Sequence, residues 1–165
     1  EDPIKEISAL QLLGAAGSHP NVLAAQEALQ DDGAVYLVTS YCGGGELHDF
    51  ILGRTLAENE ARPLFRQLAE GVAFLQSEDV RICHRDLSPE NVLLRDDGAG
   101  DSEDLVIMDF GLALRVPVDR EGRPAVVASG GAVGKLHYMS PEVLTNQPFN
   151  GFSVDVWACG VILFM

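Results

Sequence analysis

Positive charge is scarce in this sequence. Its 165 residues include 11 Lys and Arg against 25 Asp and Glu, which gives a formal net charge of −14. This balance argues against a nucleic-acid partner, because binding to a phosphate backbone relies on Lys and Arg to neutralise the phosphates. It permits a basic peptide substrate, although an acidic surface can equally serve solubility.

Cysteines and long apolar runs are also few. The three cysteines, Cys42, Cys83 and Cys159, form an odd count without a CxxC pair or metal-ligand spacing. This usage fits a reduced intracellular protein better than a disulfide scaffold. From the first residues we expect no signal peptide. The apolar run 156–165 has only ten residues, too few to span a bilayer. We therefore expect no membrane span and a location in the cytoplasm, with the nucleus as an alternative.

The remaining pattern predicts a single α+β domain in which helices dominate. A chain of this length can enclose one hydrophobic core but not two. Apolar residues at helical spacing predict helices over 4–13, 46–52, 56–76 and 156–165. Short apolar runs bounded by turn residues predict strands over 22–25, 34–41, 92–94 and 105–108. The Gly- and Pro-containing stretch up to about residue 140 is expected to be a long functional loop.

Four short motifs in a fixed order carry the chemistry. They are HRDL at 84–87, Asn91 five residues after the aspartate, DFG at 109–111 and SPE at 140–142. Any one of them alone is a weak signal. Together, with a predicted strand pair between the first motif and DFG, they match the signature of protein kinases, apart from Ser140 where alanine is usual.

The chain accordingly resembles the eukaryotic protein kinases over its whole length. HPNV at 19–22 resembles the turn after the kinase C helix, YLVTSY at 36–41 with the following GGGEL resembles the strand that enters the hinge, and DVWACG at 155–160 resembles the start of the F helix. SPEN at 88–91 is closer to the KPEN of Ser/Thr kinases than to the AARN of tyrosine kinases.

The resemblance implies a partial protein-kinase-like fold. Residues 1–41 would be the end of the N-lobe, comprising the C helix and a strand hairpin. Residues 42–47 would be the hinge, and residues 48–165 the mainly helical first half of the C-lobe. The glycine-rich loop and the ATP-binding lysine of the family have no counterpart here, so these residues alone are expected to bind ATP poorly.

The resemblance also implies ATP and Mg²⁺ as reactants and a protein Ser or Thr hydroxyl as the acceptor. Asp86 would orient the attacking hydroxyl, and Asn91 and Asp109 would bind Mg²⁺. Phe110, His84 and Leu10 would stack in a hydrophobic spine, and Asp155 would hold the catalytic loop through backbone N–H groups. The residues expected on the ATP side are Glu6, Thr39, Ser40, Cys42, Glu46 and Leu93.

Two positions depart from the family pattern in opposite ways. The lysine that Ser/Thr kinases have two residues after the catalytic aspartate is replaced by Ser88, and the threonine usual after the glycine at 134 is replaced by Lys135. We hypothesise that Lys135 reaches back to Asp86 and the γ-phosphate and restores the missing charge from the opposite side. The alternative is that Lys135 points to solvent and the site is weakened.

Regulation and activity leave alternatives open. Arg85 precedes the catalytic aspartate, and Ser129 is the hydroxyl between Gly111 and Gly134 that could carry a regulatory phosphate, or could equally be an unmodified loop serine. The main alternative to a Ser/Thr kinase is a pseudokinase that acts as an ATP-binding or scaffolding module. A small-molecule kinase is a third option, which the SPE triplet disfavours. The oligomeric state is left open.

Overall fold

The computed structural model describes residues 3–96, 104–128 and 130–165. Within these residues helices alternate with three two-stranded antiparallel sheets, which pair β1 with β2, β3 with β6 and β4 with β5. The elements in chain order are α1 (Pro3–Ala15), β1 (Ala25–Gln30), β2 (Val35–Thr39), α2 (Leu47–Ile51), α3 (Glu58–Leu75), β3 (Ile82–Cys83), the 3₁₀ turn η1 (Pro89–Asn91), β4 (Val92–Arg95), β5 (Asp104–Ile107), β6 (Leu114–Arg115), the 3₁₀ turn η2 (Leu136–Tyr138), α4 (Pro141–Leu144) and α5 (Gly151–Phe164). The predicted α+β class is confirmed.

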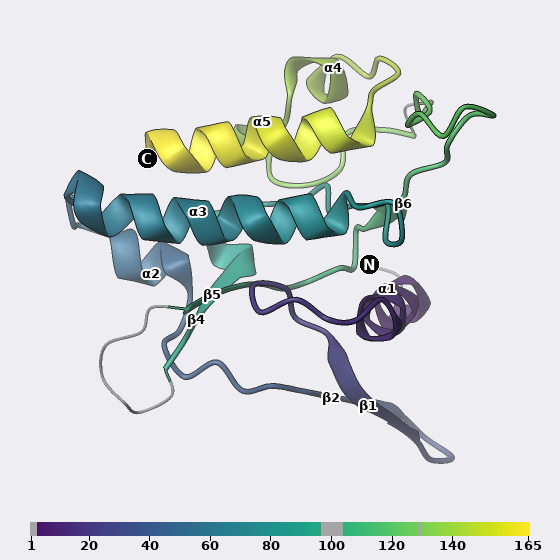
Figure 1. Cartoon of the computed structure of the whole chain (residues 1–165), viewed down its shortest axis with the longest axis horizontal. Coiled ribbons are helices and arrows are strands. Elements are labelled where there is room, and N and C mark those ends of the chain that lie inside the picture. The colour runs from purple at the N-terminus through teal and green to yellow at the C-terminus, as the bar shows by residue number, and fades with distance from the viewer. Residues whose placement is uncertain (1–2, 97–103, 129) are drawn as a thin grey trace.

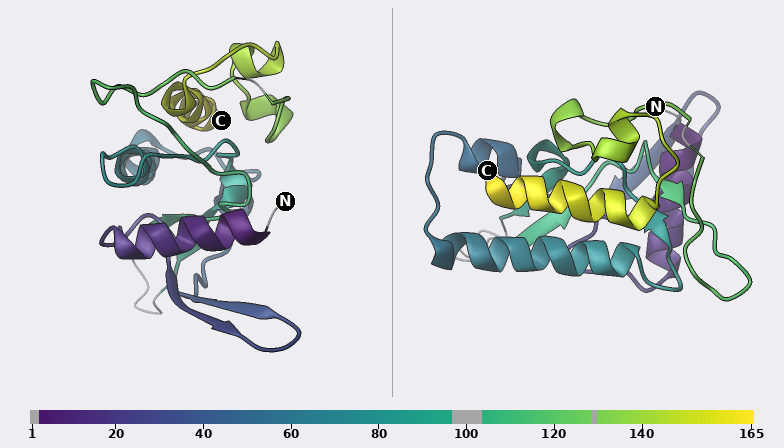
Figure 2. Two further views of the ribbon diagram at one scale, coloured as in Figure 1. Left: turned by 90° about the vertical axis from the view of Figure 1, so that its right-hand side faces the viewer. Right: turned by 90° about the horizontal axis from the view of Figure 1, so that it is seen from above.

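The two longest helices lie side by side and form the body of the molecule. α5 runs along α3, with α4 on its outer side, while α1 and the β1–β2 hairpin lie at the opposite end (Figures 1 and 2). α3 also packs on β5, so its apolar face meets the strand pair. The core between these layers includes the fully enclosed side chains of Leu68, Leu75, Ile107 and Phe110. Among the described residues, no helix is both long and apolar enough to cross a membrane.

The first predicted strand was misplaced. Residues 22–25 were expected to form it, but β1 begins only at Ala25, and Val22 instead bridges to Ile107. The cause is the turn, in which the Asp31 side chain accepts hydrogen bonds from the amides of Gly33 and Ala34, both at 2.8 Å. Such an Asx turn brings the chain straight back on itself, so the residues that pair are those directly beside it.

The second strand pair is confirmed. β4 and β5 pair antiparallel from Val92 opposite Ile107 to Arg95 opposite Asp104. Residues 97–103, in the loop expected between them, lie outside the described residues. This pair carries the segments that lead out of HRDL and into DFG, so it brings the two motifs together.

Several short elements were not predicted. β3 and β6 pair over two residues each, and α4 is a single turn. β6 lies within the stretch that was expected to be irregular, and α4 directly follows it. α5 begins at Gly151, five residues before the predicted helix, because the Asn150 side chain accepts hydrogen bonds from the amides of Phe152 and Ser153 at 3.0 and 3.4 Å. An Asn N-cap of this kind satisfies amides that have no partner inside the helix.

A buried network of side-chain amides connects the turn that follows α1 to α3 and β5. The Asn21 side chain, 5% exposed, donates to Gln67 Oε1 at 2.9 Å and to the Leu105 carbonyl at 2.8 Å. Gln67 Oε1 also accepts from the Leu105 amide at 2.8 Å. Three elements distant in sequence are therefore joined by two side chains.

We expect Asn21→Ala to lower the free energy of unfolding by about 1–3 kcal/mol, because it leaves a buried carbonyl without its donor. Chemical denaturation of the protein measures this change. The control is Asn59→Ala on the exposed face of α3, which should change the free energy by less than about 0.5 kcal/mol. Equal effects of the two substitutions would contradict the structural role of Asn21.

Candidate active site

The loop that carries HRDL is held by one carboxylate from another part of the chain. Asp155, fully buried on α5, accepts a hydrogen bond from the His84 amide at 2.7 Å and one from the Arg85 amide at 2.9 Å. Arg85 has a left-handed backbone (φ 67°), an unusual conformation for a residue with a side chain. The two hydrogen bonds to Asp155 hold the loop in that conformation, as the sequence predicted for this aspartate.

Burial raises the pKa of the Asp155 carboxyl above its ordinary value, although the neighbouring His84 and the amide hydrogen bonds lower it in part. Loss of water disfavours the charged form, and only the donors around the carboxylate compensate for that cost. Burial of the Asp155 carboxylate is therefore compensated only when the His84 and Arg85 amides are in place to bond to it.

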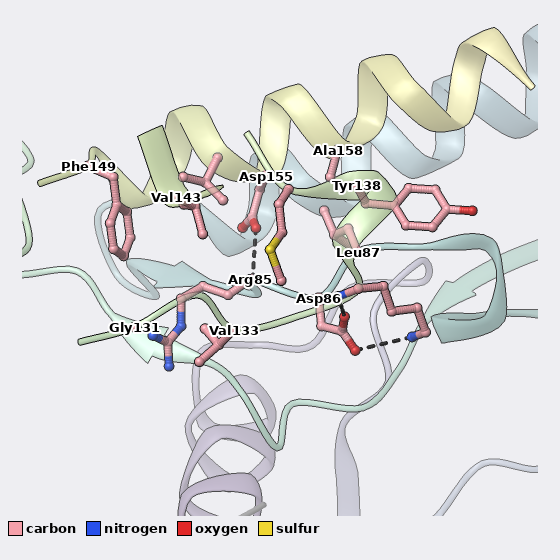
Figure 3. Close-up of a pocket in the computed structure, with 13 residues that line it drawn as sticks. Arg85, Asp86, Leu87, Gly131, Val133, Tyr138, Val143, Phe149, Asp155 and Ala158 are labelled. Atoms are coloured by element: carbon pink, nitrogen blue, oxygen red, sulfur yellow. Dashed lines mark hydrogen bonds and ion pairs between the residues drawn. The ribbon is translucent and has the colours of Figure 1, made fainter. Parts of the chain in front are cut away.

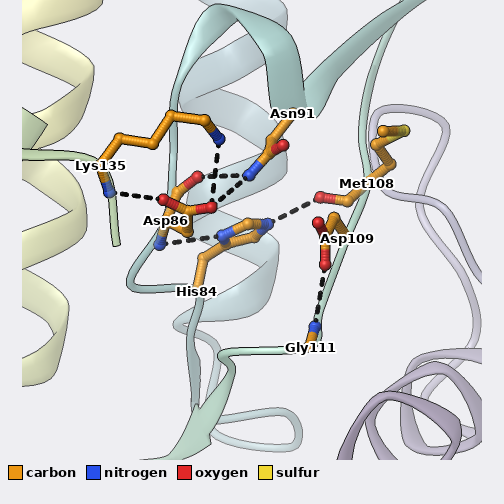
Figure 4. A network of polar contacts seen from close by, with 7 residues as sticks. All are labelled: His84, Asp86, Asn91, Met108, Asp109, Gly111 and Lys135. Atoms are coloured by element: carbon orange, nitrogen blue, oxygen red, sulfur yellow. Dashed lines mark hydrogen bonds and ion pairs between the residues drawn. The ribbon is translucent and has the colours of Figure 1, made fainter. Parts of the chain in front are cut away.

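Asp86 is the centre of the polar network drawn in Figure 4. The Asn91 side-chain nitrogen donates to the Asp86 carbonyl at 2.7 Å and to Asp86 Oδ2 at 2.8 Å. Both amide hydrogens of Asn91 are thereby used, and its Oδ1 is the atom left for a cation. The three-residue turn η1 lies at the end of the five-residue spacing from aspartate to asparagine, and it folds the second side chain back onto the first.

His84 supports this network from below. Its Nδ1 accepts from the Asp86 amide at 3.3 Å, so its Nε2 carries the proton and donates to the Met108 carbonyl at 2.8 Å. The His84 ring also packs against Phe110, with the ring centroids 5.0 Å apart. Leu10 lies in the same core cluster, in line with the predicted spine. The choice of tautomer, which links the two motifs, was not predicted from the sequence.

Asp109 is the residue after Met108, whose carbonyl bonds to His84. Its backbone is left-handed (φ 63°), and its Oδ1 accepts from the Gly111 amide at 3.1 Å. Phe110 is completely buried and so anchors the turn. Asp109 and Asn91 together offer hard oxygen atoms on neighbouring segments, a donor set that fits Mg²⁺.

Lys135 approaches Asp86 from the opposite side. Its amide donates to Asp86 Oδ1 at 2.8 Å, and its Nζ lies 3.2 Å from Asp86 Oδ2 (Figure 4). This is the contact with Asp86 that the hypothesis of a charge exchange required. Its role toward a phosphate stays a prediction. Ser88 is fully buried at the start of η1.

Gly134 makes this approach possible, a role that was not predicted for it from the sequence. Its φ is +100°, and a Cβ at this position would collide with the Arg85 carbonyl. Only glycine therefore lets the chain pass close enough for the next residue to meet Asp86. A glycine directly before the unusual lysine was the available signal.

Glu90 is a second residue that sequence reasoning missed. Burial would raise the pKa of its carboxyl, but the glutamate's own backbone amide and the charges of Lys135 and His48 lower it. Lys135 therefore acts electrostatically on Glu90 as well as pairing with Asp86. The signal was the acidic residue inside SPEN, directly before Asn91.

Five of the six residues predicted on the ATP side lie along β2, the linker after it and β4. Thr39 ends β2, and Glu46 bridges to Leu93 of β4. The linker is fixed by main-chain hydrogen bonds from Gly44 and Leu94, at 2.9 and 2.8 Å. Ser40, Cys42 and Glu6 are each partly buried, Glu6 on α1.

We call residues 109–142 the activation segment. Several residues near its end line a pocket together with the catalytic loop and α5 (Figure 3), namely Gly131, Val133, Lys135, Tyr138 and Met139. Arg85 lies in this pocket beside Gly131 and Val133, and its Nε donates to the Leu112 carbonyl at 2.7 Å. Ser129 lies outside the described residues, so its suggested phosphorylation stays a prediction.

We expect Asp155→Asn to destabilise the protein by about 1–3 kcal/mol at neutral pH, because one of two buried amides loses its acceptor. The pKa of Asp155 is raised in the folded protein. Its contribution to stability is therefore complete below the ordinary carboxyl pKa and decreases as the pH rises through the folded value. The difference in unfolding free energy between wild type and variant should shrink as the pH rises from about 4.

Denaturation curves over a pH series measure this difference. Asp32→Asn, in the exposed hairpin turn, is the matched control. A pH-independent difference for Asp155→Asn would show that the buried carboxyl does not titrate as its surroundings require.

Comparison with known proteins agrees with the site. A family model described as the protein kinase domain matches residues 1–165. CBL-interacting protein kinase 9 of Oryza sativa subsp. japonica is 40% identical over 163 residues, which are 98% of this chain and 32% of the relative. CBL-interacting serine/threonine-protein kinase 15 of Arabidopsis thaliana is 38% identical over 161 residues, 98% of this chain and 35% of the relative.

A fungal relative gives the same result. The probable serine/threonine-protein kinase HSL1 of Saccharomyces cerevisiae is 38% identical over 162 residues, 97% of this chain and 10% of the relative. The chain thus spans between 10% and 35% of the length of these three relatives. The match over all its residues, together with the Asp86, Asn91 and Asp109 arrangement, means that the chain belongs to the protein kinase domain family.

Proposed function

We propose that the protein transfers the γ-phosphoryl group of ATP to serine or threonine hydroxyls of protein substrates. The observation that carries the proposal is the joint geometry of Asp86 and Asn91, with Asp109 on the adjoining segment. Relatives named serine/threonine-protein kinases, 38% identical to this chain, support the choice of acceptor.

Asp86 is the proposed base for the acceptor hydroxyl. A group that accepts this proton must lie within hydrogen-bonding reach of the substrate and be held in one orientation. Asn91 and the Lys135 amide fix both carboxylate oxygens. The side chain of Asp86 is 12% exposed, so it remains reachable from outside.

Asn91 Oδ1 and the Asp109 carboxylate are the proposed Mg²⁺ ligands. Mg²⁺ bound there would neutralise charge on the phosphates of ATP. Thr39, Ser40 and Cys42 would border the adenine, with Leu93 beneath the ring and Glu46 near the ribose. The bridge between Glu46 and Leu93 supports a common position for the last two residues. Glu6 would pair with a lysine that binds ATP. Lys135 and Ser88 complete the proposed catalytic set, in the roles argued below.

We further propose an intracellular protein, in the cytoplasm or the nucleus, that does not bind nucleic acid. Cys42, Cys83 and Cys159 are all unpaired, as is usual for a reducing compartment. The net charge of −14 favours basic protein substrates over polyanions.

We expect Asp109→Ala to reduce phosphoryl transfer by at least about 10³-fold, because the metal loses a charged ligand where the phosphates need one. The measurement is autophosphorylation and peptide-library phosphorylation by the full-length protein. Asp104→Ala, at the exposed start of β5, is the matched control and should retain transfer.

A wild-type protein that binds ATP with Mg²⁺, seen as a rise in melting temperature, but transfers nothing would instead favour the pseudokinase alternative. In that case the module would bind nucleotide or act as a scaffold. Transfer that survives in Asp109→Ala would contradict the assigned metal site.

A further inference from the structure

The positive charge nearest to Asp86 comes from Lys135 of the activation segment. We propose that the Lys135 ammonium binds the phosphoryl group during its transfer, so that the activation segment rather than the catalytic loop provides the protein's cation. The proposal rests on the function proposed above. It assigns a further catalytic residue and makes transfer depend on docking of the segment that carries it.

The reaction needs a cation at this place. The acceptor oxygen forms a bond to the γ-phosphorus while the bond from phosphorus to the bridging oxygen of ADP breaks, and ADP leaves with that electron pair. The hydroxyl proton passes to Asp86. The transferred group carries negative charge into a site that already holds the carboxylates of Asp86 and Asp109, so fixed positive charge lowers the barrier.

Few basic side chains are available to meet this need. All 11 Lys and Arg residues lie within the described ranges. In that part of the chain the ion pairs of Arg62, Arg66 and Arg123 lie on exposed surfaces, and only Lys135 pairs with a carboxylate of the reaction centre. Arg85 extends along the segment instead, to the Leu112 carbonyl.

The geometry of Lys135 suits a second ligand. Its Nζ makes a contact of 3.2 Å with Asp86 Oδ2, an atom that already accepts from Asn91 at the shorter distance of 2.8 Å. The Lys135 side chain is 36% exposed, and an ammonium has three donors. A partly exposed ion pair of this kind adds little to stability. The Lys135 ammonium therefore has hydrogen-bond donors available for a ligand, and its ion pair contributes little to stability.

Apart from Arg85, whose guanidinium bonds to the Leu112 carbonyl, the catalytic loop offers no cation. Ser88, two residues after Asp86, has a neutral side chain and is fully buried. The backbone at Lys135 is held in register by Gly134, whose missing side chain lets the segment lie against the Arg85 carbonyl. Upstream, Val127 and Phe149 exchange main-chain hydrogen bonds of 2.8 and 3.0 Å. The ammonium is thus in place only when the segment is docked at these points.

The first test compares charge at position 135 in the full-length protein. Lys135→Gln should lower kcat about 10²-fold with less than a threefold change in the KM for ATP, and Lys135→Arg should recover at least tenfold of that loss. Arg120→Gln removes the same charge from an exposed site on the same segment and should retain transfer. If Lys135→Gln is as active as wild type, Lys135 is not the cation, while the proposed kinase function stands. If wild type and Arg120→Gln are both inactive, the proposed function itself fails.

The second test moves the cation. Ser88→Lys and Lys135→Thr should each impair transfer, and the double variant should be at least tenfold more active than Lys135→Thr alone.

Val127→Pro removes the N–H that bonds to the Phe149 carbonyl. It should lower transfer at least fivefold in wild type but less than twofold in the double variant, whose cation no longer depends on the segment. Additive single effects, or equal losses from Val127→Pro in both backgrounds, would overturn the proposal. Circular dichroism and melting temperature confirm that each variant is folded.

Discussion

The site depends on one buried carboxylate. Asp155 is completely enclosed on α5, yet it is the acceptor for the two amides that set the path of the HRDL loop. A group of this kind opposes folding unless its donors are in place. α5 and the HRDL loop therefore adopt their native positions together. The remaining polar contacts of the site depend on this junction between helix and loop.

From this junction the structure extends through main-chain atoms as much as side chains. The Arg85 amide bonds to Asp155, and the Arg85 carbonyl lies against Gly134 of the activation segment. One residue of the catalytic loop thus contacts both α5 and the segment. Asp86 follows directly and receives donors from Asn91 and from Lys135. The proposed base, a proposed metal ligand and the proposed cation are consequently positioned by one short stretch of backbone.

The sequence predicted those parts of the fold that rest on local signals. The apolar period of α3 and the β4–β5 pair were placed within a few residues, because each buries one continuous face. The pairing of β3 with β6 was missed, since two-residue strands leave no period in the sequence. β1 was misplaced because a single side chain, Asp31, sets the register, whereas an apolar run is only an average over residues.

The site was predictable to the extent that residue types are specific. The resemblance assigned roles to Asp86, Asn91, Asp109 and Asp155, and the unusual pair Ser88 and Lys135 led to a contact that the geometry contains. The tautomer of His84 and the need for glycine at 134 depend on distances between segments, which no local pattern expresses.

The reliance on backbone atoms has an evolutionary consequence. Peptide N–H and C=O groups are present whatever side chain a residue carries, so the main-chain hydrogen bonds between Val127 and Phe149 do not depend on which side chains stand there, proline at 127 excepted. The rice relative retains only 40% of the residues over the aligned chain. A frame held in this way lets most of the sequence drift while a handful of side chains keep the chemistry, and a charge can migrate from one segment to another without rebuilding the fold.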